Sequence, residues 1–96
     1  MTTDHIKEVG IDELERLYII TETEKFEFIY RYAAEVNWNE SKNQLYTPKP
    51  TQEMPYINWF KQILLATRHE YGIELKLTQK TIWNNIEDNL QKEIMS

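Results

Sequence analysis

Residues 24–37, Glu24-Lys-Phe-Glu-Phe-Ile-Tyr-Arg-Tyr-Ala-Ala-Glu-Val-Asn37, have a very wide apolar surface if they are wound as an α-helix. At about 100° per residue, one face of that helix would present Phe26, Ile29, Tyr30, Ala33 and Val36. Phe28 and Tyr32 lie one turn apart and widen the apolar arc to roughly 200°, about twice the width usual for a surface helix. The pattern predicts a helix that is either central to the fold or has a second aromatic edge facing a partner.

The residues before this helix predict a short element and a tail. Thr21-Glu-Thr-Glu24 has the spacing of a capping box, in which the threonine and glutamate side chains bond the first backbone N–H groups of a helix. Residues 11–20 fit a short helix, although their last four residues are all apolar and fit a buried strand equally well. Residues 1–9 are polar, so we expect a flexible N-terminal tail followed by a single helical domain over residues 10–96.

Beyond Asn37 the helical pattern stops. Residues 38–55 contain all three prolines and a Ser-Lys-Asn turn, which exclude a continuous helix. Loops of this length without structure are uncommon in compact domains. We therefore expect Trp38, Leu45 and Tyr46 to hold this segment against the body of the domain, in the form of a small hairpin.

Helical periodicity returns after Pro55. Proline suits the first position of a helix and glycine the left-handed residue that ends one, so we expect a helix from Pro55 to Gly72. Residues 73–77 alternate between apolar and polar, as a strand does. Thr78 is a suitable cap for a last helix over residues 79–93.

These elements predict a mainly α fold, with about four helices around an aromatic core and at most a short two-stranded β element. In that element, residues 73–77 would pair with residues 17–20 or 44–46, because one strand alone cannot form a sheet. An α+β fold is the alternative. A length of 96 residues is typical of one domain.

Composition limits the classes of function. The formal net charge is −5, which argues against binding to the phosphate backbone of nucleic acids. The chain has no cysteine, so disulfides and thiolate chemistry are excluded. No apolar stretch is long enough for a bilayer, and the first residues lack an apolar signal segment. We expect a cytoplasmic protein that does not enter a membrane.

No motif in the chain predicts catalysis. His5 lies in the expected tail, and His69 is followed by Glu-Tyr-Gly-Ile rather than by the second histidine of a zinc-binding His-Glu-x-x-His motif. Ser41 and Ser96 lack the surroundings of a nucleophile, and glycines at positions 10 and 72 alone cannot form a phosphate-binding loop. We therefore expect no catalytic residue, no metal site, no cofactor, no small-molecule ligand and no enzymatic activity.

The remaining candidate is an interaction surface made by Phe28, Tyr32 and Leu65 and bordered by Glu27 and Glu35. Aromatic side chains are enriched where protein interfaces bind most tightly. We expect a small, acidic, non-enzymatic protein that takes part in protein–protein interaction or regulation, with a homodimer as one form of that interaction.

Two alternatives remain open. The first is a helix-turn-helix-like DNA-binding regulator that uses residues 56–92 and reads bases from its last helix, although the connection between Gly72 and Thr78 is long for that motif. The second is an inhibitor or immunity-type protein whose acidic rim attracts a basic partner.

Overall fold

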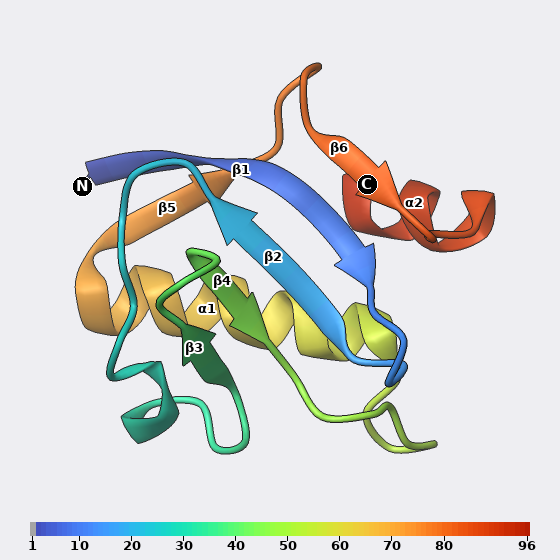
Figure 1. Ribbon diagram of the computed structural model, residues 1–96, viewed down its shortest axis with the longest axis horizontal. Coiled ribbons are helices and arrows are strands. Elements are labelled where there is room, and N and C mark those ends of the chain that lie inside the picture. The colour runs from blue at the N-terminus through green and yellow to red at the C-terminus, as the bar shows by residue number, and fades with distance from the viewer. Residues whose placement is uncertain (1) are drawn as a thin grey trace.

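The computed structural model describes residues 2–96 and has an α+β fold (Figure 1). The strands are β1 (Thr2–Ile11), β2 (Leu17–Thr21), β3 (Asn37–Asn39), β4 (Gln44–Tyr46), β5 (Ile73–Lys76) and β6 (Ile82–Asn84). The helices are α1 (Tyr56–Tyr71), α2 (Asp88–Met95) and the single-turn 3₁₀ helix η1 (Ile29–Arg31). The prediction of a mainly α protein with about four helices is therefore wrong, because a six-stranded sheet dominates the described residues.

Strand β1 is the centre of the sheet, whose order is β3-β4-β2-β1-β5. It pairs antiparallel with β2 on one side. On the other side, residues 2–5 run parallel to β5 and residues 8–10 run parallel to β6. The expected flexible tail over residues 1–9 is thus strand from Thr2 onward. The alternation of inward and outward residues along β1 is not evident in the sequence, because the first inward-facing residue is the charged Asp4.

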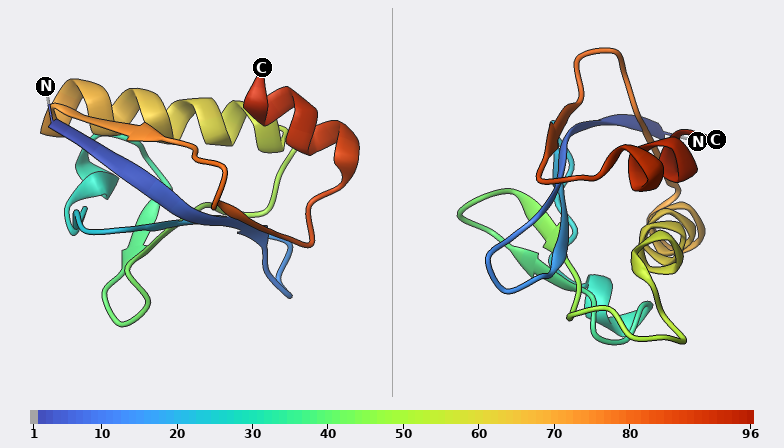
Figure 2. Two further views of the ribbon diagram at one scale, coloured as in Figure 1. Left: turned by 90° about the horizontal axis from the view of Figure 1, so that it is seen from above. Right: turned by 90° about the vertical axis from the view of Figure 1, so that its right-hand side faces the viewer.

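Helix α1 lies across one face of this sheet (Figure 2). Its buried face, which includes Trp59, Phe60 and Ile63, packs on apolar side chains of the strands. The fully buried apolar residues of the strands are Ile6, Val9, Leu17, Ile19 and Leu45. The prediction for this helix is confirmed, and it ends at Gly72, which has φ 65°.

Residues 24–37 do not form the predicted α-helix. Turns and the short η1 carry the chain through this segment, and Glu35 adopts a left-handed φ of 72° just before β3. The apolar side chains Phe26, Ile29, Ala33 and Val36 are nevertheless fully buried. Phe26 packs edge-on against Trp38 and Tyr71, with ring centroids 5.8 and 5.0 Å apart. These contacts with β3 and α1 outweigh the helix propensity of the segment.

Of the other local predictions, the capping box is wrong and the hairpin is confirmed. The Thr21 hydroxyl donates to the carbonyl of Glu24 at 2.7 Å, so Thr21–Glu24 is not a capping box. Residues 17–20 belong to strand β2 and not to a helix, and the expected hairpin is made by β3 and β4, over residues 37–46.

The C-terminal third also differs from the prediction. Residues 73–76 form strand β5, as expected, but it pairs with β1 and not with residues 17–20 or 44–46. The predicted helix over residues 79–93 is wrong: a turn leads into β6, and α2 begins only at Asp88. Backbone pairing with β1 and the left-handed φ of 58° at Asn85 interrupt the helical periodicity.

Asp4 is a buried charge, with 3% of its surface exposed. Its carboxylate accepts hydrogen bonds from the backbone N–H groups of Thr23 and Glu24, at 3.2 and 2.9 Å. The Thr23 hydroxyl donates a third bond at 3.0 Å. A buried charge is tolerated when it is hydrogen-bonded in this way. Asp4 therefore fastens the segment that leaves β2 to the first half of β1.

Replacing Asp4 with alanine should lower the free energy of unfolding by about 2–3 kcal/mol, because two backbone N–H groups lose their acceptor. Urea unfolding followed by tryptophan fluorescence measures this loss. Asp88→Ala removes an exposed carboxylate from the first turn of α2 and should cost no more than about 1 kcal/mol. Equal losses for the two variants would contradict the anchoring role of Asp4.

Gly10 gives room to the ring of Tyr18 on the neighbouring strand. A Cβ atom at position 10 would lie 2.3 Å from the Cζ and hydroxyl oxygen of Tyr18. At Gly72, by contrast, a Cβ would have nothing within 4 Å, and the positive φ alone favours glycine. The two glycines are therefore required for different physical reasons.

Gly10→Ala should destabilise the fold by about 1–3 kcal/mol through steric overlap with Tyr18. In a Tyr18→Ala background the same change should cost far less, since the clashing ring is gone. Gly72→Ala should cost about 1 kcal/mol in either background. A double-mutant cycle measured by urea unfolding checks these values, and additive costs of Gly10→Ala and Tyr18→Ala would contradict the steric explanation.

Candidate interaction surface

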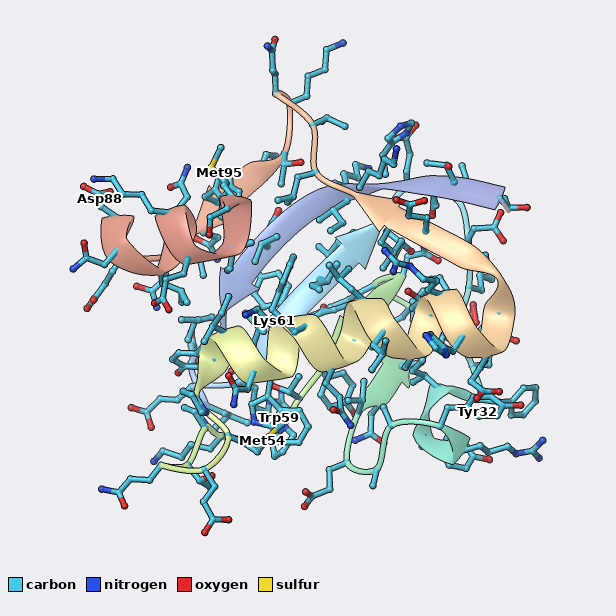
Figure 3. The ribbon with its side chains drawn as sticks, turned by 180° about the vertical axis from the view of Figure 1, so that it is seen from behind. Tyr32, Met54, Trp59, Lys61, Asp88 and Met95 are labelled. Atoms are coloured by element: carbon cyan, nitrogen blue, oxygen red, sulfur yellow. The ribbon has the colours of Figure 1, made fainter. Side chains whose placement is uncertain are left out.

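Four large hydrophobic side chains are exposed on η1, at its two flanking residues and on α1. Phe28, Tyr30 and Tyr32 expose 48%, 51% and 47% of their surfaces, and Leu65 of α1 exposes 54%. Tyr32 and Leu65 line the same small cavity of 210 Å³. Figure 3 shows Tyr32 at the outer side of the molecule, below the C-terminal half of α1. We call these four residues the aromatic surface.

Tyr71, at the end of α1, fastens the aromatic surface to the body of the protein. Its hydroxyl oxygen accepts a hydrogen bond from the backbone N–H of Phe28 at 3.1 Å, and its ring packs edge-on against that of Tyr32, with centroids 6.1 Å apart. Burial raises the pKa of the Tyr71 hydroxyl, so it stays protonated at neutral pH. The exposed rings are therefore attached to a half-buried anchor.

The outer rings also contact one another. Phe28 and Tyr30 pack edge-on with centroids 6.5 Å apart, and the guanidinium of Arg31 lies 4.7 Å from the centre of the Phe28 ring. Such aromatic and cation–π contacts limit the motion of side chains that water would otherwise surround.

The structure brings together the residues that the sequence pointed to, on a different backbone. Phe28 and Tyr32 contact Tyr71, and Leu65 lines a cavity together with Tyr32. Glu27 and Glu35 are exposed beside Phe28 and Tyr32 in the chain. The predicted wide helical arc does not exist, since the segment is not an α-helix. The sequence pattern also placed Tyr30 on the buried face and gave no role to Tyr71. The exposure of Tyr30 and the contacts of Tyr71 cannot be derived from helical periodicity.

Another cavity, of 740 Å³, is lined by residues of β1, β2, β4 and β6, among them Glu8, Tyr18 and Tyr46. Here the Tyr18 hydroxyl donates to the carboxylate of Glu8 and accepts a bond of 2.8 Å from the side-chain amide of Asn84. Burial raises the pKa of Tyr18, so the hydroxyl keeps its proton. Because the three side chains satisfy one another, their evident role is to link β1, β2 and β6.

Asp12 and Arg16, which also line this cavity, likewise bind each other. The Nε of Arg16 donates to Asp12 at 2.8 Å, while the guanidinium lies 4.8 Å from the centre of the Tyr46 ring. The pair fixes the turn between β1 and β2. Sequence periodicity could not identify this cavity, because it arises from the pairing of distant strands.

The histidines do not form a cluster. His5 lies on β1 with Nδ1 3.9 Å from a carboxylate oxygen of Glu22, and His69 is exposed on α1. Within residues 2–96, no three His, Cys, Asp or Glu side chains converge closely enough to hold a metal ion. None of the helices in this range is long and apolar enough to cross a membrane.

The helix-turn-helix alternative over residues 56–92 is wrong in its architecture. Strands β5 and β6 separate α1 from α2, so the two helices are not joined by a short turn. The expected reading helix over residues 79–93 is strand and loop up to Glu87. What remains of it, α2, begins with the acidic Asp88.

Comparisons with known proteins identify the family. The family model described as "Integron Cassette Protein Hfx_Cass5" matches residues 4–81. A solved structure of Integron Cassette Protein Hfx_Cass5, from the mobile metagenome of the North West Arm sewage outfall, shares 34% sequence identity with the chain. It aligns over 98% of this chain and 93% of the other, with a TM-score of 0.50. No curated protein matches significantly. The chain therefore belongs to the Hfx_Cass5 family of integron cassette proteins.

Proposed function

We propose that this protein is a non-enzymatic interaction protein that associates with a second copy of itself through the aromatic surface. One observation carries the proposal: these four side chains are half-exposed and linked to one another. Phe28 and Tyr32 both contact Tyr71, Tyr30 packs on Phe28, and Leu65 shares a cavity with Tyr32. The non-enzymatic part rests on the sequence, in which no nucleophile, phosphate-loop or metal-ligand motif occurs.

The energetics of interfaces support a binding role for this surface. Tyrosine and other large aromatic side chains account for much of the binding energy in protein interfaces, particularly where they cluster. Scattered apolar residues on a surface are ordinary, but a contiguous group marks a contact site. Rings already held by neighbouring rings also lose less conformational entropy when they are covered.

The charges around the surface favour a second copy over a partner of one charge sign. Arg31 stacks on Phe28, while Glu27 and Glu35 flank the same rings in the chain. In the part of the chain that the structure describes, none of these three groups forms an ion pair. A two-fold contact places the same patch on both sides, so a rim with both signs can pair with itself.

Sedimentation equilibrium tests the proposal. The wild type should form a dimer at high micromolar concentration. Phe28→Ser/Tyr32→Ser should raise its dissociation constant by at least about tenfold, because two aromatic contacts on each protomer are lost. Both side chains are half-exposed, so the melting temperature of the monomer should change little.

Leu14→Ser is the matched control. Leu14 exposes 63% of its surface in the turn between β1 and β2, at the other end of the molecule from η1 (Figure 1), and its loss should leave the dissociation constant unchanged. A wild type that stays monomeric, or an equal weakening by Leu14→Ser, would rule out self-association through the aromatic surface.

A further inference from the structure

A second surface lies at the end of the molecule where α2 sits against the first turns of α1 (Figure 2). A cleft of 710 Å³ opens there between three segments that are distant in sequence: the β1–β2 turn, the start of α1, and residues 85–93. Its lining residues are Ile11, Asp12, Glu13, Glu15, Pro55, Tyr56, Ile57, Asn85, Glu87, Asn89, Leu90 and Glu93. We call it the acidic cleft.

The floor of the acidic cleft is apolar. Ile11, Tyr56, Ile57 and Leu90 are partly buried and pack on the edge of the main core. The Tyr56 hydroxyl donates to the backbone carbonyl of Glu15 at 2.8 Å, which joins the start of α1 to the β1–β2 turn. A volume of this size and an apolar floor are typical of binding sites.

All the charged groups that line the cleft are negative. They are Asp12, Glu13, Glu15, Glu87 and Glu93, and no lysine, arginine or histidine appears among the lining residues that the structure describes. Arg16 pairs with Asp12, and Lys49 pairs with Glu15 at 2.6 Å. Glu13, Glu87 and Glu93 form no ion pair within residues 2–96.

The electrostatics of Tyr56 are consistent with a negative potential in the cleft. Burial is the main reason that the pKa of its hydroxyl is raised; the nearby charges of Glu15 and Asp12 raise it further, and the charge of Lys49 lowers it by a smaller amount. The carboxylates are spread around the apolar floor and do not meet at one point, as a metal site requires. Such an arrangement suits several cationic groups that are spaced apart and joined by apolar side chains.

We propose that the acidic cleft binds a basic amphipathic segment of a partner protein. Its apolar side chains would lie on Ile57 and Leu90, and its lysines or arginines would face Glu13, Glu87 and Glu93. A second copy of this chain carries a net charge of −5, and nucleic acids and anionic lipids are negative as well, so charge disfavours each of them as the occupant. The cleft and the aromatic surface use different residues, so this inference does not depend on self-association.

The probe is a synthetic amphipathic helix of leucine and lysine with about four turns, titrated by calorimetry. The intact protein should bind it with a dissociation constant that rises with added salt. Glu87→Gln/Glu93→Gln should raise that constant about tenfold through loss of two cleft charges, and Leu90→Ser should raise it through loss of the floor. A peptide of leucine and glutamate should not bind.

Glu22→Gln/Glu74→Gln is the matched control, since it removes the same net charge from an exposed position just after β2 and a half-exposed position on β5. It should change the dissociation constant less than about twofold. Circular dichroism of every variant checks that α2 remains folded. Phe28→Ser/Tyr32→Ser should still bind the leucine–lysine peptide, which separates this test from that of self-association.

Three outcomes would overturn the inference. The leucine–lysine peptide fails to bind, the control pair weakens binding as much as the cleft pair, or the leucine–glutamate peptide binds equally well. The second outcome would mean attraction to overall charge, and the third would mean apolar contact without charge recognition.

Discussion

The pairing of β1 with three other strands holds this protein together. One strand of ten residues contributes backbone hydrogen bonds to β2 along one edge and to β5 and then β6 along the other. Its inward side chains Ile6 and Val9 are almost completely buried in the hydrophobic core. The N-terminal and C-terminal parts of the chain thus meet in one sheet, and the rest of the fold depends on that meeting.

One edge of β1 pairs first with β5 and then with β6, and this change of partner has a local physical cause. The register of β1 against β2 shifts between Ile6 and Glu8, which breaks the regular ladder at Lys7. The carbonyl of Ile6, at this irregularity, accepts a hydrogen bond of 2.7 Å from the buried hydroxyl of Thr81. Thr81 lies directly before β6, so one side chain both satisfies the backbone of β1 and guides the chain into the next strand.

The two surfaces follow from the same architecture. Where the chain leaves the sheet through η1, the inner side chains of the segment are buried and Phe28, Tyr30 and Tyr32 are left outside. Of these three, Phe28 and Tyr32 contact Tyr71. At the other end of the molecule, α2 lies across the start of α1 and closes one side of the acidic cleft. One surface is aromatic with charges of both signs, and the other is apolar with charges of one sign. They therefore suit different partners.

The sequence by itself determined the elements whose signals are local. Pro55, Gly72 and an apolar face specify α1, and strict alternation specifies β5, because backbone geometry and one buried face are enough for each. It also pointed to Phe28, Tyr32 and Leu65 as hydrophobic side chains that lie outside the buried face of their predicted helices.

Only the tertiary structure decided that residues 2–9 are the central strand, that residues 24–37 are turns, and that residues 82–84 leave the helical pattern. In each case the deciding contacts come from residues far along the chain: β5 and β6 for β1, Trp38 and Tyr71 for Phe26, and β1 for β6. Strand pairing and edge-on ring packing act between distant residues, and a periodicity counted along neighbours contains no information about them.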